Sequence, residues 1–180
     1  MMRTIVAVSV LFVLGLVSGA LAFNEPEGFR GVPWGTLHGS VSAQIPEMNE
    51  CDRGGWVDGD CHGTVRIGGV ETSVNMLFSP SSGFEAVWLS FDPREFVIMK
   101  QIFVERYGQP TEERNEEIQT STGARYQNTV LKWTGNKVVI LLARHGSKIT
   151  ESFASLETRA RYEREREKLR ERVKEGKKDL

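Results

Sequence analysis

The sequence predicts an α+β fold: a two-layer domain with an antiparallel sheet and helices on one face, built from two helix-plus-hairpin units, plus a charged C-terminal helix. Two observations lead to this class. Short stretches of alternating apolar and polar residues, typical of strands, come in pairs joined by turn residues. A helix signal precedes each pair, so the order of helix and hairpin occurs twice, over residues 36–91 and 92–144.

The composition is that of an ordinary globular domain. The 180 residues include 23 Lys and Arg against 24 Asp and Glu, which gives a net charge of −1, and 39% are hydrophobic. These values exclude the collagen-like, disulfide-dense and low-complexity classes. The lack of a basic surplus also argues against a nucleic-acid-binding protein, because such proteins need cations to meet the phosphates.

The first 22 residues have the pattern of a secretory signal peptide. Arg3 gives a positive start, an apolar run follows from Ile5 to Val17, and Ala20-Leu21-Ala22 forms an A-x-A cleavage site. We therefore expect cleavage before Phe23 and a periplasmic or secreted protein. The alternative is an uncleaved N-terminal anchor, because the run approaches the roughly 20 apolar residues that a membrane span needs. No later stretch is apolar enough to span a bilayer.

The first helix-plus-hairpin unit opens with a short predicted strand at residues 29–33. Thr36 fits the N-cap position of a helix after it. The apolar residues of this helix, at near-helical spacing, are Leu37, Val41, Ile45 and Met48. Residues 46–64 are rich in Gly and Asp and are predicted to form a long loop. Strands at 73–78 and 84–91, joined by a Ser/Pro/Gly turn, complete the first hairpin.

The second unit begins with the strongest local signal, Asp92-Pro93-Arg94-Glu95. Asp92 can cap the first amides of a helix, and proline fits its first position. The residues expected to face the core are Phe96, Met99, Ile102 and Phe103. Gly108 is placed to end the helix in a left-handed conformation. A charged loop is predicted at 111–117, and the strands that follow it at 125–134, 137–144 and 148–153.

The C-terminal segment, residues 154–180, differs in composition from the 23–153 α+β domain. From Glu157 to Leu180 there are 10 basic and 7 acidic residues. Oppositely charged residues four apart support a helix. We expect Phe153 and Leu156 to pack the beginning of this helix and its distal half to be solvated, because apolar residues become sparse there.

Three short motifs carry a resemblance to known proteins. The opening Phe29-Arg30-Gly31-Val32-Pro33-Trp34-Gly35-Thr36, with Tyr107-Gly108-Gln109-Pro110 and Trp133, resembles an uncharacterised family of small exported bacterial proteins. In its element order the chain is also similar to beta-lactamase inhibitor protein and to the small lipoprotein of the outer-membrane β-barrel assembly machine, although it lacks the lipoprotein cysteine. These resemblances imply an envelope protein that binds another protein and performs no catalysis.

The segment from Cys51 to His62 is the most informative loop. In an exported protein its two cysteines, Cys51 and Cys61, are expected to form a disulfide. Trp56 is either an exposed anchor for a partner or a plug over the sheet. A metal site is the alternative, since the segment offers the candidate ligands Asp52, Asp58, Asp60 and His62. Their spacing matches neither an EF-hand nor a zinc site, so no metal or other cofactor is expected.

The common catalytic motifs of hydrolases, metalloproteases and nucleotide-binding enzymes are absent from the sequence. We therefore expect a non-enzymatic periplasmic binding protein whose partner is another envelope protein. The candidate contact residues are Trp56, Asp58, Asp60, Arg166 and Arg170. The alternative function is a small-molecule or metal-binding protein, including a hydrolase, that uses the 51–62 loop.

Overall fold

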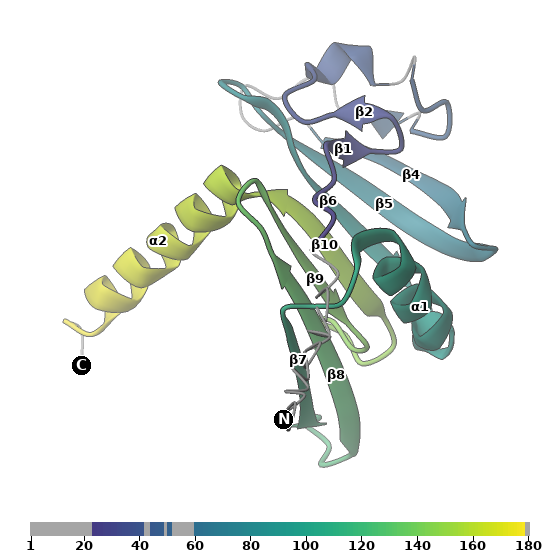
Figure 1. Cartoon of the computed structure of the whole chain (residues 1–180). Coiled ribbons are helices and arrows are strands. Elements are labelled where there is room, and N and C mark those ends of the chain that lie inside the picture. Colours follow the sequence, from purple (N-terminus) through teal and green to yellow (C-terminus); the bar gives the residue numbers. More distant parts are fainter. Residues whose placement is uncertain (1–22, 42–43, 49, 52–59, 179–180) are drawn as a thin grey trace, which may run out of the picture.

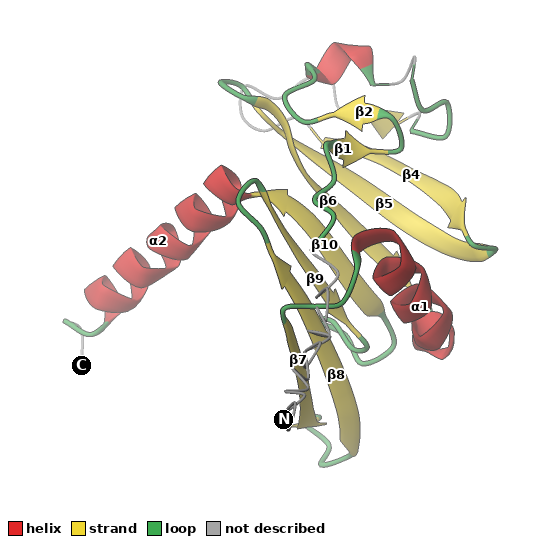
Figure 2. Ribbon diagram, viewed as in Figure 1, coloured by secondary structure: helices red, strands yellow, loops and turns green. Residues whose placement is uncertain are grey.

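The α+β class is confirmed by the computed structural model, which describes residues 23–41, 44–48, 50–51 and 60–178. These residues form an eight-stranded sheet, a two-stranded sheet and two α-helices (Figures 1 and 2). The helices are α1 (Phe96–Tyr107) and α2 (Arg159–Gly176), and the small sheet pairs β1 (Gly28–Phe29) with β2 (Val32–Pro33). The strands of the large sheet are β3 (Glu50–Cys51), β4 (Asp60–Ile67), β5 (Val70–Ser79), β6 (Gly83–Phe91), β7 (Glu112–Gln119), β8 (Arg125–Thr134), β9 (Val138–Ala143) and β10 (Ser152–Thr158).

The large sheet consists of two runs of sequential antiparallel strands. Its order is β3-β4-β5-β6-β10-β9-β8-β7. Helix α1 connects β6 at the centre of the sheet to β7 at its edge, and the chain then returns strand by strand until β10 pairs with β6. The last strand therefore lies in the middle of the sheet and joins the two runs, with Leu89 of β6 opposite Ala154 of β10.

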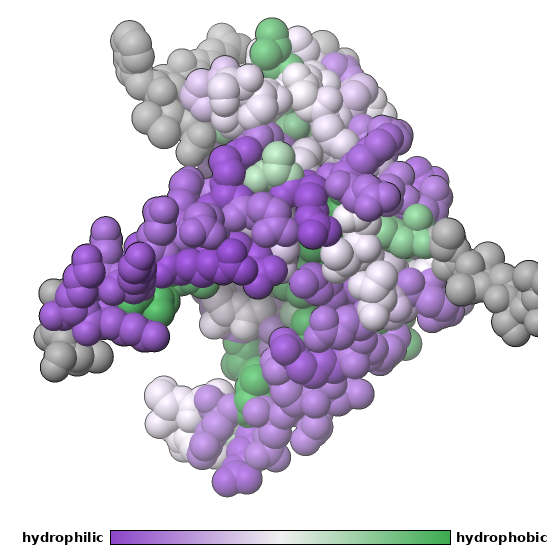
Figure 3. All heavy atoms as spheres, turned by 60° about the vertical axis from the view of Figure 1, so that its left-hand side comes forward, coloured by the Kyte–Doolittle hydropathy of each residue, from purple (hydrophilic) through white to green (hydrophobic). Residues whose placement is uncertain are grey.

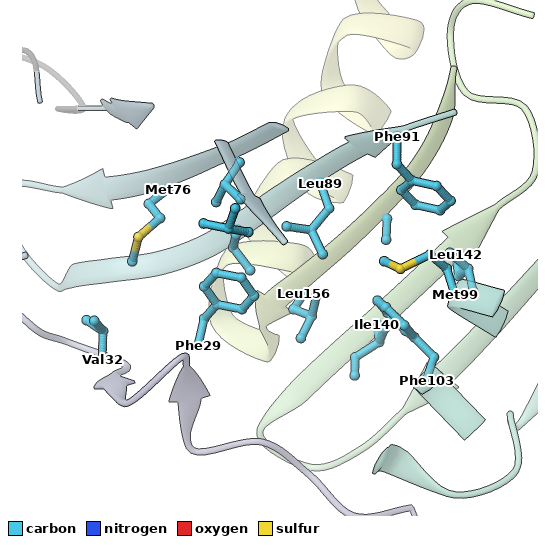
Figure 4. Packing of buried hydrophobic residues seen from close by; sticks show 14 of the residues in the cluster. Phe29, Val32, Met76, Leu89, Phe91, Met99, Phe103, Ile140, Leu142 and Leu156 are labelled. Carbon is cyan, nitrogen blue, oxygen red and sulfur yellow. The ribbon is translucent and has the colours of Figure 1, made fainter. Parts of the chain in front are cut away.

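One face of the sheet, which we call the core face, carries the main hydrophobic core. A row of apolar side chains crosses it from strand to strand, in the order Val74, Leu89, Ala154, Leu142 and Leu131. Helix α1 and the described residues of the N-terminal segment, 23–41 and 44–48, cover this face (Figures 1 and 4). The α1 residues buried against it are Phe96, Met99 and Phe103, as predicted, with Ile102 partly buried.

The predicted C-terminal end of α1 is confirmed, but its beginning differs from the prediction. Pro93–Glu95, predicted as the first helical turn, form a 3₁₀ turn that Asp92 caps, and α1 begins at Phe96. A carboxylate oxygen of Asp92 accepts a hydrogen bond from the backbone N–H of Arg94 at 2.8 Å. Hydrogen bonds from the Arg94 guanidinium and this backbone amide lower the pKa of Asp92 to about 2. At the other end Gly108 has a φ of 86° and donates its N–H to the Val104 carbonyl at 2.8 Å. A positive φ is one that glycine adopts without a steric cost.

The helix predicted at residues 36–48 does not form as an α-helix. Within this segment the described residues form a 3₁₀ turn at His38–Ser40. The Thr36 hydroxyl donates to the Pro33 carbonyl at 2.8 Å and so does not cap a helix, and Gly39 weakens helical structure further. The apolar pattern is still used, because Val41, Ile45 and Met48 are buried in the core, whereas Leu37 is exposed.

Two segments predicted as loops are strands. Residues 60–67, which begin inside the predicted loop 46–64, form β4, and residues 112–119, which overlap the predicted charged loop, form β7. Strand β4 alternates polar residues with Cys61, Gly63 and Val65, but the glycine hides this pattern in the sequence. Strand β7 lies at the sheet edge, where charged side chains protect unpaired backbone groups from other chains.

The last strand lies further along the chain than the predicted range 148–153, because β10 begins only at Ser152. It runs to Thr158, so the expected boundary at residue 154 falls inside β10, and the helix begins at Arg159. Ala154 and Leu156 are fully buried on the core face of the sheet. Leu156 therefore packs the sheet and not the beginning of the helix. The helix is capped by Thr158, whose hydroxyl accepts from the Arg161 N–H at 3.4 Å.

Candidate binding surface

The second face of the large sheet, which we call the outer face, lies opposite the core face. Across four of its strands this face carries polar and aromatic side chains. In the register His62 of β4 lies opposite Asn75 of β5, and Asn75 lies opposite Trp88 of β6. In the next row Ser90 of β6 lies opposite Phe153 of β10. Strand alternation therefore gathers these residues on one face, although they are far apart in the sequence.

A shallow hollow of about 730 Å³ lies on this part of the outer face. Trp88 and Phe153 line it, with their ring centroids 6.2 Å apart in an edge-to-face arrangement. Trp88 is 38% exposed, and its Nε1 donates to a Glu157 carboxylate oxygen at 3.4 Å. The polar residues around the pair include His62 and Asn75. Such a surface offers apolar contact area together with hydrogen-bonding groups, as protein interfaces do.

Helix α2 is fixed to the outer face through Glu85. The pairing of β5 with β6 skips this residue, since Leu77 lies opposite Ala86 and Phe78 opposite Phe84. The resulting bulge directs the Glu85 side chain toward α2. Its carboxylate forms an ion pair with Arg164 and lies 3.9 Å from the Arg161 guanidinium.

The Glu85 side chain is only 4% exposed and also accepts a hydrogen bond from the Ser82 hydroxyl. A buried carboxylate with these partners holds the base of α2 at one position on the sheet, which we call the seat of α2. A second contact lies nearby: Lys132 of β8 donates from Nζ to the Tyr162 hydroxyl at 3.0 Å, and this Nζ lies 5.1 Å from the centre of the Tyr162 ring.

Beyond these contacts α2 extends away from the sheet. Every residue from Glu165 to Lys178 is solvent-exposed, and most of them are charged (Figures 1 and 3). Leu169 and Val173 are 60% and 52% exposed. They stand four residues apart and therefore lie on the same side of the helix. The distal helix thus presents a small apolar stripe among charges, as expected of its solvated half.

Three of the predicted contact residues are in the described part of the chain. Asp60 lies on the outer face in one cross-strand row with Leu77 and Ala86, at the end of the sheet where α2 begins. Arg166 and Arg170 are exposed on α2. The guanidinium of Arg166 lies 5.5 Å from the Tyr162 ring, and that of Arg170 pairs with Glu167 at 3.1 Å. The fold therefore brings the base of α2 and Asp60 to the same end of the molecule.

Trp56, Asp58 and Asp52 lie outside the described residues. Four exposed or partly exposed apolar residues of this surface were not among the predicted contact residues: Trp88, Phe153, Leu169 and Val173. For Trp88 a signal was present, because it alternates with the core residues Val87 and Leu89 and so had to face the other way.

The backbone of Cys51 is paired directly with that of Cys61 between β3 and β4. Directly opposite residues in antiparallel strands have Cα atoms about 4.5–5.5 Å apart. This separation lies within the range that a disulfide bridges, about 4.4–6.8 Å. Cys61 itself is fully buried.

The proposed metal ligands are only partly described. Nε2 of His62 lies 4.0 Å from a carboxylate oxygen of Asp60. Within the described residues no group of three or more His, Cys, Asp or Glu side chains is arranged to hold a metal ion.

Neither helix in the described part of the chain is both long and apolar enough to cross a membrane. The chain matches no protein-family model, no curated protein and no solved structure.

Proposed function

We propose that this chain is a non-enzymatic periplasmic protein that binds another envelope protein through α2 and the adjoining outer face. The observation that carries the proposal is the distal half of α2. It extends beyond the sheet with Leu169 and Val173 exposed, while Glu85 holds the base of the helix in a buried seat. The distal half of the helix adds little to the core of the domain, yet its base is held in a defined position. Such a helix is suited to contact a partner.

The chemistry of the surface indicates the kind of partner. An amphipathic helix docks by laying its apolar residues into a groove, and charged residues beside them fix its orientation. On α2 the apolar stripe is flanked by Arg166 and Arg170. Trp88, on the outer face, adds an aromatic anchor of the type that dominates binding energy at interfaces. The expected partner surface is an apolar groove with acidic residues at its rim.

Export and a Cys51–Cys61 disulfide belong to the same proposal. The direct pairing of the two cysteines across β3 and β4 supports the disulfide. Closing this loop would stabilise the domain by roughly 2–4 kcal/mol. Mass spectrometry of the exported protein should find the two residues joined and resistant to alkylation before reduction. Two free thiols in the exported protein would contradict this part of the proposal.

The binding proposal is tested with two double variants in the native host. Leu169→Ser with Val173→Ser removes the apolar stripe of α2, and Val97→Ser with Ile98→Ser makes the same change on the exposed side of α1. Affinity purification followed by quantitative mass spectrometry should recover a reproducible envelope protein with wild type and with the α1 variant. Recovery should fall at least about tenfold with the α2 variant, because buried apolar contacts are lost. Equal recovery with both variants would refute the proposal.

A further inference from the structure

A cavity of about 340 Å³ opens on the core face, between the β1–β2 hairpin and α1. Leu89 of β6 and Leu156 of β10 line it from the sheet, Phe29 lines it from β1, and Ile102 and Phe103 line it from α1. Figure 4 shows Phe29 and Phe103 on opposite sides of Leu89 and Leu156. The interior of the cavity is therefore apolar, and it lies on the opposite side of the sheet from the outer face.

Three arginines, Arg30, Arg66 and Arg106, line the same cavity, and no carboxylate does. Two of them have loose partners: Arg30 lies 3.5 Å from Glu47, and Arg66 lies 3.8 Å from Glu71. Arg106 forms no ion pair with any described residue. The cavity thus combines an apolar interior with an excess of positive charge.

Two further acidic side chains near the cavity do not cancel this charge. Glu25 and Glu27 line a neighbouring hollow that shares Arg30 and Arg106 with the cavity. The Glu25 carboxylate accepts three backbone N–H groups of the β8–β9 turn. The Glu27 carboxylate pairs with Lys137 at 2.9 Å. Both acids are therefore engaged with groups outside the cavity.

The backbone at Arg30 is a second, independent observation. Arg30 and Gly31 form the two-residue turn between β1 and β2, with φ values of 48° and 86°. Hairpin turns with two positive φ values favour Asn-Gly, because side chains other than Asn and Gly are strained in the first position. Retained strain of this kind is typical of positions where the side chain has a function.

We propose that this cavity binds one medium-chain fatty acid, with the alkyl chain against the partly buried lining residues Ile67, Ile102 and Tyr107 and the carboxylate near Arg30 and Arg106. Charge complementarity favours an anionic head group, and the guanidinium fork suits a carboxylate. The volume lies at the lower end of the range for ligand pockets, about 300–1,000 Å³, which favours a single chain over a two-chain lipid.

Isothermal titration calorimetry of the full mature chain tests this proposal with three probes, each below its micelle concentration. Dodecanoate should bind saturably at one site. Dodecyltrimethylammonium, with the same tail and a cationic head, should bind at least about tenfold more weakly, because it meets like charges. Acetate, with the head group alone, should show no binding. Equal binding of the two dodecyl compounds, or no saturable binding of dodecanoate, would overturn the proposal.

Two variants distinguish this cavity from other apolar surfaces. Arg30→Asn removes the charge and relieves the backbone, so the melting temperature should hold or rise while dodecanoate affinity falls about tenfold. Ile102→Phe adds volume in the cavity and should weaken binding, whereas Ile98→Phe, on the exposed side of the same helix, should not. Wild-type affinity in Arg30→Asn, or equal affinities for the two phenylalanine variants, would refute the site. Partner recovery through α2 is measured separately, so either proposal can fail alone.

Discussion

The Glu85 carboxylate lies on the outer face because the β5–β6 pairing skips this residue, and there it meets two arginines of α2. Arg161 is itself 15% exposed at its side chain, so removing the carboxylate leaves a mostly buried cation without its partner. The loss of one member of a buried pair is costly for this reason. Glu85, together with the contacts of Arg159 and Tyr162, thus holds the first turns of α2 in place.

We therefore expect Glu85→Gln to lower the free energy of unfolding by about 1–3 kcal/mol. In a domain of this size the melting temperature should fall by roughly 3–10 °C. Trypsin should also cut α2 faster, which limited proteolysis measures. The matched control is Glu117→Gln, which breaks an exposed pair with Arg125 and should cost less than about 1 kcal/mol. Equal effects of the two changes would argue against the seat of α2.

Glu25 anchors the first described residues to the β8–β9 turn. Its carboxylate accepts the N–H groups of Asn136, Lys137 and Val138 at 2.9, 2.6 and 2.9 Å. Partial burial of Glu25 acts to raise its pKa, but these three hydrogen bonds and the charge of Lys137 together lower the pKa below the ordinary 4.5. The ionised form is thus favoured in the folded protein.

A lowered folded-state pKa has a defined consequence for stability. The stabilisation by Glu25 is present above the unfolded pKa, near 4.5, and is lost as the pH falls through the folded value. We expect Glu25→Gln to cost about 1 kcal/mol at pH 7, a modest value because the site is well solvated. Urea titrations of both proteins between pH 7 and pH 3 should show the difference shrinking only below about pH 4.5. A difference that grows on acidification would contradict this account.

At the level of elements, the sequence predicted best where local signals and packing agree. Asp92 and Pro93 mark the turn that leads into α1, and Gly108 marks the end of the helix, through side-chain and backbone chemistry that needs no tertiary partner. Local sequence patterns predicted the wrong element where contacts with distant residues determine the secondary structure. Residues 112–119 are too charged to read as a strand, yet β8 supplies backbone partners along their whole length. The sequence around Leu156 is compatible with a helix or a strand. It forms a strand because Leu156 is buried between its cross-strand neighbours Val87 and Ile140.

The candidate site was predictable only in part, for the same reason. Exposure of Arg166 and Arg170 follows from charge density along one helix, which is a local property. The hollow around Trp88 and Phe153 depends on the pairing of β6 with β10, residues far apart in sequence, which no local pattern specifies. The seat of α2 depends on a bulge at Glu85, which is visible only in the register.

The distal part of α2 is expected to contribute little to stability. Residues from Arg166 onward are exposed, and the contacts to Glu85 and Lys132 all come from earlier residues. A chain ending at Arg166 should therefore melt within about 2 °C of the full chain, since surface changes usually stay within about 0.5 kcal/mol. Differential scanning calorimetry measures this. A fall of many degrees would show that the distal helix supports the fold and is not free for a partner.

At the scale of the whole molecule, the β8–β9 turn forms hydrogen bonds with both the first described segment and the beginning of α2. Glu25 binds its N–H groups, while Arg159, at the start of α2, donates its backbone N–H to the Lys137 carbonyl at 2.6 Å and its guanidinium to the Gly135 carbonyl at 3.0 Å. The core face is covered by α1 and the N-terminal segment, and the opposite face carries α2 (Figure 1). The fold thus combines one covered face with one face that is partly free.

The most direct measurement is site-specific photo-crosslinking in living cells. A photoreactive amino acid would replace Trp88, Leu169 or Val173, and Val97 on α1 would serve as the control position. If α2 and the outer face bind an envelope partner, the first three positions should crosslink to one common protein, and position 97 should not. Crosslinks that are absent from all four positions, or equally abundant at position 97, in a folded and exported protein would contradict the account.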